Sequence, residues 1–242
     1  IFYRSIYYYR WVIFIMISKN IQVTSLNRAE TLRYLQCNGS INDDFSNLID
    51  TCETQILKVI QPRYIYQMFD ITNLQDCIAV NGTGLKFYGN DIKNHLKGCS
   101  KAILMCATIS SNVDRLIRMA EISDMAKALI LDVLSSVAIE NVCNQVDTIV
   151  KEEYPQYYQT WRFSAGYGDF PIDIQKDFLN VLNAPKKIGL CVTDTNIMTP
   201  RKSVTAVMGL STTPIEKKRL GCASCNMKDV CQYRAKSLKC SY

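Results

Sequence analysis

Four cysteines close to the end of the chain have the residue type and spacing to hold a metal centre. They follow the pattern Cys222-x2-Cys225-x5-Cys231-x8-Cys240 within a basic stretch. A Cys-x2-Cys pair can bind one metal ion or cluster, and the later cysteines can complete the set of ligands. Neighbouring Lys and Arg offset the negative charge of a thiolate-ligated centre. We expect a [4Fe–4S] cluster here, with structural zinc as one alternative and free thiols or a disulfide as the other.

A loop at residues 161–171 is the other segment whose residue types could do chemistry. It reads Trp-Arg-Phe-Ser-Ala-Gly-Tyr-Gly-Asp-Phe-Pro. Gly166 and Gly168 allow a tight turn whose backbone groups can meet a ligand directly. Arg162 can hold a carboxylate through two hydrogen bonds, and Tyr167 can stack on an adenine or a sugar. The alternative is an ordinary turn with a solvated Arg162, because the Gly-x-Gly pair lacks the third glycine of a dinucleotide-binding motif.

Residues 190–210 form a second candidate segment. They predict two strands joined by a polar turn at 199–202. These strands could line the same pocket as the 161–171 loop. A β-hairpin that belongs only to the core is the alternative interpretation.

The remaining cysteines and the single histidine limit the function classes. The chain has 11 cysteines, and those outside the tail are scattered, several of them in apolar runs, so we expect buried free thiols. An odd number of cysteines without a clear secretory signal favours the reducing cytoplasm. His95 is the only histidine, which excludes enzymes that need two. It lies in a short amphipathic stretch, so we expect it at the surface or at a helix cap.

The charge of the chain is concentrated in its last residues. Lys and Arg number 28 against 22 Asp and Glu, and the excess falls on residues 217–242, so residues 1–216 are balanced. A balanced body does not predict a nucleic-acid interface. One alternative function remains for the tail alone: a basic module, held together by zinc, that binds nucleic acid while the body serves as a scaffold.

The two ends of the chain differ in composition from the body. The uncharged run 11–18 is too short to span a bilayer, and no small-residue cleavage site follows it. We expect translation to begin at Met16, with residues 1–15 as an upstream extension; a membrane anchor is the alternative. A composition break near 211–221 divides the rest into a domain over 16–212 and a basic Cys-rich tail over 213–242.

The hydrophobic patterns predict a mixed succession of helices and strands. Helices are expected over 27–35, 42–60, 91–96, from 111 onward, over 123–152 and over 172–182. Strands are expected over 63–71, 102–109, 161–163, 188–193 and 203–210. Because the order lacks a strict strand–helix–strand alternation, it favours an α+β fold with an antiparallel sheet over a doubly wound one.

Several spaced motifs in residues 162–210 resemble the activation domain of cobalamin-dependent methionine synthase. They are Arg162-x3-Gly166-Tyr167-x3-Pro171, Ile188-Gly189, Thr193-Asp194, Met198-x-Pro200 and Ser203-Val204. Stretches farther upstream, at 27–35, 62–66, 89–99 and 123–132, are similar to the stand-alone form of this domain in anaerobic bacteria. There the methionine synthase lacks its own activation domain. The resemblance extends over residues 16–242.

This resemblance implies a fold, a ligand and two partners. The fold would be a C-shaped α+β domain with a twisted antiparallel sheet flanked by helices, and the ligand would be S-adenosylmethionine. The domain would dock on the cobalamin-carrying methionine synthase when the cobalt has oxidised to the inactive cob(II) state. One electron from a donor such as flavodoxin or ferredoxin, with a methyl group from S-adenosylmethionine, would restore methylcobalamin. No nucleic acid or membrane partner is implied.

The resemblance also assigns ligand contacts, position by position. The matching positions are Arg162, Ser164, Ala165, Gly166, Tyr167, Glu140 and Met208. Arg162 would hold the ligand carboxylate, and Met208 stands where the family has a tyrosine. No residue is assigned a catalytic role, because methyl transfer to cobalt depends on positioning. An activator that uses the C-terminal cluster without S-adenosylmethionine is the alternative function.

Overall fold

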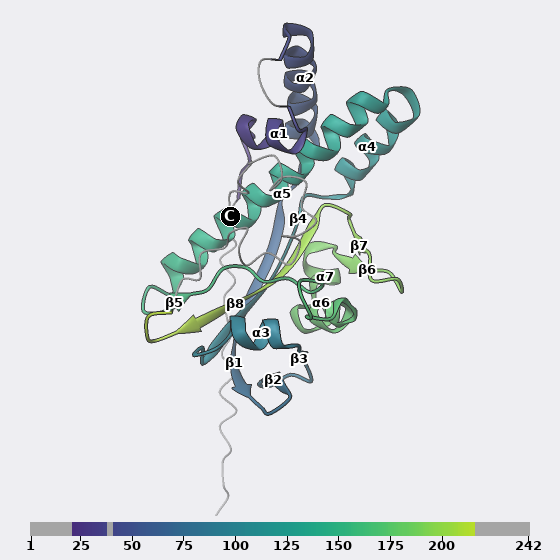
Figure 1. Cartoon of the computed structure of the whole chain (residues 1–242). Helices are drawn as coiled ribbons and strands as arrows, with labels where there is room; N and C mark the ends of the chain where they lie inside the picture. Colours follow the sequence, from purple (N-terminus) through teal and green to yellow (C-terminus); the bar gives the residue numbers. More distant parts are fainter. Residues whose placement is uncertain (1–20, 38–40, 216–242) are drawn as a thin grey trace, which may run out of the picture.

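A six-stranded antiparallel sheet organises residues 21–37 and 41–215, which the computed structural model describes (Figure 1). Its spatial order is β3-β2-β1-β4-β8-β5, and every neighbouring pair is antiparallel. The strands are β1 (Arg63–Asn73), β2 (Cys77–Val80), β3 (Lys86–Tyr88), β4 (Lys101–Thr108), β5 (Tyr158–Gln159) and β8 (Ser203–Ser211). A separate hairpin joins β6 (Cys191–Val192) to β7 (Met198–Thr199).

Helices cover both faces of this sheet (Figure 1). They are α1 (Arg28–Tyr34), α2 (Asp43–Val59), α3 (Asn90–His95), α4 (Ser111–Ser123), α5 (Met125–Glu153), α6 (Gln175–Leu182) and α7 (Ala184–Ile188), with a 3₁₀ turn at Ile172–Ile174. The predicted α+β class with an antiparallel sheet is therefore confirmed.

Short polar side chains set where three of the helices begin. Asn27 Oδ1 accepts a hydrogen bond from Glu30 N at 3.1 Å, and Asn42 Oδ1 accepts one from Phe45 N at 2.9 Å. Asp124 caps α5 in the same way, through a 3.0 Å bond from Lys127 N. Such caps satisfy amide groups that the first turn leaves without partners.

The central strand β4 separates two apolar cores. Alternate side chains of a strand point to opposite faces, so β4 supplies both. One core lies beneath α2, α4 and α5 and receives Ile103, Met105 and Ala107. The other lies beneath α3, α6 and α7 and receives Ala102, Leu104 and Cys106.

The connection between α7 and β8 corrects one prediction. We expected strands over 188–193 and 203–210 joined by a turn at 199–202, with a core β-hairpin as the alternative. Instead β8 pairs with β4 and β5, and β6 pairs with β7. Residues 184–188 are helical, and Pro185 fits there because it stands in the first helical turn. Gly189, with φ of 70°, ends that helix.

The segment expected as a strand at 161–163 is only partly one. Regular pairing is confined to β5, and beyond it Phe163 forms an isolated bridge with Val207. Between them, Gly209 N donates to the hydroxyl oxygen of Thr160 at 2.8 Å rather than to a backbone carbonyl. Thr160 N still donates to Gly209 O at 2.9 Å, so the hydroxyl replaces only one of the two backbone bonds of this pair. Strands β2 and β3 were not among the elements expected from the sequence.

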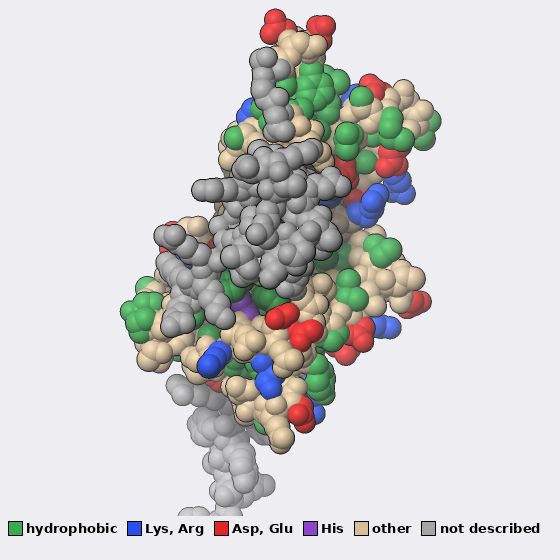
Figure 2. All heavy atoms as spheres, in the orientation of Figure 1, with side chains coloured by type: hydrophobic (Ala, Val, Ile, Leu, Met, Phe, Trp, Pro, Cys, Tyr) green, Lys and Arg blue, Asp and Glu red, His purple; other side chains and the backbone are tan. Residues whose placement is uncertain are grey.

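The described surface carries mixed charge. Figure 2 shows Lys and Arg side chains interspersed with Asp and Glu on one face of the molecule. Within the described ranges, no helix combines the length and apolarity that crossing a membrane requires.

Truncating the centre of α5 should destabilise the fold. Leu134 is fully buried in the larger core, whereas Leu129 on the same helix is 59% exposed. We expect Leu134→Ala to lower the free energy of unfolding by about 2–5 kcal/mol, because it leaves a cavity. Leu129→Ala, the matched control, should stay within about 0.5 kcal/mol of the unaltered protein in urea unfolding. Equal losses for both would contradict the packing of α5.

Candidate functional site

The loop after β5 folds back on itself through backbone hydrogen bonds. Gly166 N donates to Phe170 O at 2.8 Å, and Phe170 N donates to Tyr167 O at 3.0 Å. Gly166 has a φ of 90°, which glycine adopts without strain. The turn at residues 166–169 is exposed, so its backbone and side chains are accessible from solvent.

Two aspartates fasten this turn to the start of α3. Asp169 Oδ2 accepts from Asn90 N at 2.7 Å and Asp169 Oδ1 from Asp91 N at 2.9 Å, while Asp91 Oδ2 accepts from Asp169 N at 3.2 Å. The amide donors of Asp91 and Asn90 lower the pKa of Asp169. The approach is close, since a Cβ on Gly168 would lie 1.9 Å from Asp91 Oδ2. The turn is thereby held in one position.

Arg162 precedes the turn and binds the opposite layer, helix α5. Its Nη1 donates to Asp147 Oδ2 at 2.6 Å, and its Nη2 donates to Glu140 Oε2 at 2.9 Å and to Asn144 Oδ1 at 3.1 Å. Positions 140, 144 and 147 are spaced by four and three residues, so they share one face of the helix. These bonds use three of the five N–H groups of the guanidinium.

Asp147 is the more buried of the two carboxylates. Its side chain is 23% exposed, against 48% for Glu140. Burial raises the pKa of Asp147 to about 6, although the positive charge of Arg162 opposes this change. Asp147 therefore holds Arg162 from the protein side, and Glu140 meets it at the solvent edge.

Tyr167 lies beside this group of charges. Its ring packs edge-on to Phe163, with 6.0 Å between the centroids, and the residue is 56% exposed. Partial burial raises the pKa of Tyr167, the carboxylate of Glu140 raises it further, and Arg162 lowers it. An exposed phenol next to a charged group can cover the flat face of a ligand.

Three of the residues predicted to bind a ligand thus come together: Arg162, Glu140 and Tyr167. Ser164 and Ala165, in the same loop, are half-buried, and Gly166 is exposed. Met208 is fully buried in the larger core, where Gln159 Nε2 donates to its sulfur at 2.9 Å. It is a core residue in this structure, and a ligand contact from this position stays a prediction.

Asn144 and Asp147 were not among the residues predicted from the sequence to bind a ligand. A signal was present, because polar residues recur at 140, 144 and 147 in a helix that is otherwise mostly apolar. This spacing predicts a polar stripe on one helix face. It does not reveal which loop the stripe meets, since Arg162 approaches it only through the tertiary fold.

His95 corrects another expectation. We placed it at the surface or at a cap, but it is only 6% exposed. Its Nε2 lies 2.9 Å from Thr160 Oγ1, and its ring packs against Trp161 and Phe163. Burial lowers the pKa of His95 to about 4, although backbone carbonyls of Val207 and Trp161 oppose this change.

The proposed metal ligands Cys222, Cys225, Cys231 and Cys240 lie outside the described residues. Among residues 21–37 and 41–215, no group of three or more His, Cys, Asp or Glu is arranged to hold a metal ion. The cysteines in these ranges are free thiols, and Cys52, Cys77, Cys106 and Cys143 are buried.

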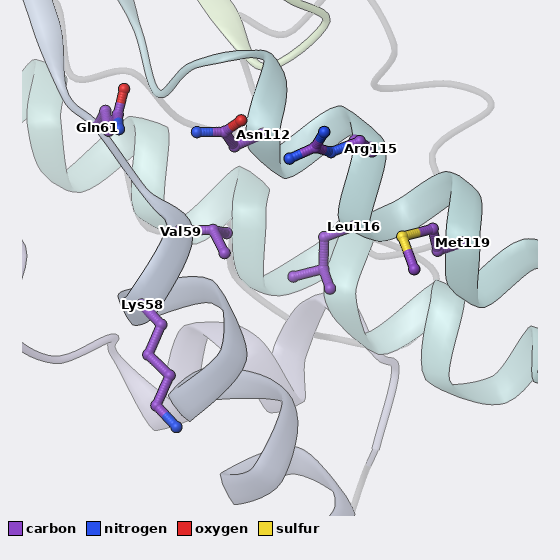
Figure 3. A pocket seen from close by; sticks show the side chains of 7 residues that line it. All are labelled: Lys58, Val59, Gln61, Asn112, Arg115, Leu116 and Met119. Atoms are coloured by element: carbon purple, nitrogen blue, oxygen red, sulfur yellow. The ribbon is translucent and has the colours of Figure 1, made fainter.

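A separate hollow of about 280 Å³ lies between α2 and α4 (Figure 3). Asn112 and Arg115 of α4 line it, with Lys58 of α2 and the apolar side chains of Val59 and Leu116 among the others. None of the residues predicted from the sequence to bind a ligand lines this hollow.

The half-buried carboxylate of Asp147 should make the stability of the protein depend on pH. The pKa of Asp147 is raised in the folded state, so the folded chain binds this proton more tightly than the unfolded chain. Its contribution to stability should therefore fall as pH rises from about 4 to about 6. Unfolding of the unaltered protein and of Asp147→Asn across this range isolates the effect, and the unaltered protein should lose stability relative to the variant. A relative gain would mean that Arg162 outweighs burial.

Comparisons with known proteins identify the fold. No protein-family model matches the chain, and no curated protein matches it. Among solved structures, the crystal structure of the MetH reactivation domain bound to AdoHcy is similar, with a TM-score of 0.56 and 14% sequence identity. The match covers 87% of this chain and 74% of that one. The chain therefore has the fold of the MetH reactivation domain, as the motifs in residues 162–210 predicted.

Proposed function

We propose that this protein binds S-adenosylmethionine in the site around Arg162 and reactivates a cobalamin-dependent methionine synthase that lacks its own activation domain. The observation that carries the proposal is the pairing of Arg162 with Glu140 at the solvent edge of a fold shared with the MetH reactivation domain. One of the motifs that predicted the fold, at residues 162–171, contains Arg162 and Tyr167 of this site.

The site suits the amino-acid end of the ligand. Arg162 offers a cation for a carboxylate, and Glu140 offers an anion for an ammonium group. A ligand carboxylate can take the place of Glu140 or Asn144 at Nη2, because these partners lie on the exposed side. Asp147 meanwhile keeps Nη1 and holds the guanidinium in place.

The charge of the site suits the sulfonium end. Two carboxylates, Glu140 and Asp147, face one guanidinium, so the site is net negative near neutral pH. S-adenosylmethionine carries a sulfonium, an ammonium and a carboxylate, and is therefore a net cation. Tyr167 is exposed beside these charges and can cover the nucleoside.

The residues of this chain would act by binding and orientation. When bound, the ligand supplies the methyl group that the cobalt of the partner accepts after a one-electron reduction. The exposed turn at 166–169, fastened to α3, gives the partner a rigid edge to meet. A fixed geometry of this kind is what methyl transfer requires, since no proton moves in that step.

The tail over 213–242 would supply the electron path. Its four cysteines suit a [4Fe–4S] cluster, and its basic residues suit an acidic donor such as flavodoxin or ferredoxin. The domain over 16–212 would carry the ligand site. In this arrangement the tail passes an electron from the donor to cob(II)alamin on the docked partner.

Replacing Arg162 tests the ligand site. Calorimetry should show S-adenosylmethionine binding to the unaltered protein, and Arg162→Ala should weaken it by at least about tenfold, because a charged hydrogen bond is lost. Arg118→Ala, an exposed arginine on α4, is the matched control and should bind normally. Glu140→Gln should weaken binding without removing the guanidinium.

The outcomes of this experiment distinguish a reactivator that binds S-adenosylmethionine from an activator that does not. Absence of binding to the unaltered protein, with capture of a cobalamin-carrying methionine synthase retained, would favour an activator that does not use S-adenosylmethionine. Unchanged affinity in Arg162→Ala would remove Arg162 from the site. Circular dichroism of each variant shows whether a loss of affinity is a loss of folding.

Anaerobic purification tests the tail. About four iron and four sulfide per chain are expected for one [4Fe–4S] cluster, and Cys225→Ser should reduce both. Cys191→Ser, an exposed cysteine in β6, is the control and should leave the metal content unchanged. One zinc without sulfide would remove the electron path from the proposal, and an absence of metal would refute the metal site.

A further inference from the structure

The only histidine of the chain lies directly behind the strand segment that carries Arg162. The ring of His95 packs edge-on to Trp161, with 4.8 Å between centroids, and is stacked with Phe163 at 4.9 Å. Trp161 and Phe163 are the immediate neighbours of Arg162. Because side chains alternate along an extended segment, Arg162 points the other way, toward Asp147.

A hydrogen-bond chain ties the same ring to the sheet. Thr160 Oγ1 lies 2.9 Å from His95 Nε2 and accepts from Gly209 N at 2.8 Å. On the far side of Arg162, Phe163 N donates to Val207 O at 2.9 Å. The segment is therefore fixed on both sides of Arg162. At Thr160 the imidazole adds to the backbone bond that Thr160 N donates to Gly209 O at 2.9 Å.

The surroundings of the ring keep it uncharged. Burial lowers the pKa of His95 to about 4. Cys99, whose sulfur would lie 2.5 Å from a Cβ on Gly209, is itself neutral because burial raises its pKa to about 11. On α3, Asp91 and Lys93 are engaged with backbone groups of the 166–169 turn and of the β1–β2 connection.

We infer that His95 is a positioning residue for Arg162: its neutral imidazole, held by Thr160 and packed between Trp161 and Phe163, aims the guanidinium at α5 and into the ligand site. Protonation places a positive charge on a buried ring whose Nδ1 has no hydrogen-bond partner among the described residues. This cost releases the segment, so the site loses its ligand in acid. This inference rests on the proposed function of Arg162, but its structural part does not need the ligand.

The direction of the pH effect follows from the altered pKa. The pKa of His95 in the folded chain is below its ordinary value, so the unfolded chain takes up this proton first. The contribution of the neutral ring is complete above about pH 6.5 and is lost as pH falls toward about 4. Asp147, with its raised pKa, acts in the opposite direction over part of this range.

Nuclear magnetic resonance of the unaltered protein tests the structural part. A preparation with a histidine-free tag gives one imidazole signal, which should titrate near pH 4. The Nε–Hε signal of Arg162, assigned by its absence in Arg162→Ala, should show a step with the same midpoint, separate from the step near pH 6 that its partner Asp147 contributes, before circular dichroism shows global unfolding. An imidazole midpoint near 6.5, an Arg162 signal that does not follow it, or a shift only with global unfolding would overturn the inference.

Two variants test the positioning of Arg162 at neutral pH. Thr160→Val removes the hydrogen bond to the ring and should weaken S-adenosylmethionine binding roughly tenfold while moving the Arg162 signal. Thr54→Val, an exposed threonine on α2, is the control. His95→Gln keeps a neutral donor and acceptor, so it should retain more affinity than His95→Ala and lose the acid dependence. Equal affinities in these two variants would contradict the inference.

These readouts separate the two proposals. If the unaltered protein binds no S-adenosylmethionine, the proposed function fails, while the shared titration of His95 and Arg162 still decides the positioning role. If the ligand binds but the Arg162 signal does not change when His95 is protonated, only the positioning role fails.

Discussion

The contact between Arg162 and α5 is the constraint on which the candidate site depends. A loop from one layer meets a helix from the other through bonds to Glu140, Asn144 and Asp147. Partly buried charges are costly to leave unpaired, so this contact fixes the loop relative to the helix. Exposure to solvent increases across this contact, from the half-buried Asp147 to the exposed Glu140. The guanidinium of Arg162 is thus held on the side of Asp147 and accessible to solvent on the side of Glu140.

Helix α5 serves the core and the site at once. Its apolar faces pack on the sheet and on α2 and α4, and they pin the helix axis over the larger core. This packing also holds the polar face at 140, 144 and 147 in a fixed position. The 166–169 turn is held independently by Asp91 and Asp169 against α3. Elements from both layers therefore hold the site, which suits a function that depends on positioning.

The two proteins share a fold at 14% sequence identity. The sheet and its cores require apolar residues of suitable size at given positions, but several different apolar residues meet that requirement. The larger helices could be predicted because their caps and apolar periodicity are local. Asn27, Asn42 and Asp124 each cap a helix that the sequence indicated. The pairing of β8 with β4 could not be predicted in the same way, because strand pairing joins residues about a hundred positions apart.

The sequence alone indicated the α+β class, the exposed turn around Gly166 and the spacing of the four cysteines in the tail. It identified Arg162 and Glu140 but not their contact, and it placed His95 at the wrong depth. Only the tertiary structure decided these points. Burial and ion pairing depend on which distant segments meet, and the energy of a charge depends on the solvent that those segments exclude. Local sequence patterns indicate helices, strands and turns, but they do not indicate which distant segments come into contact.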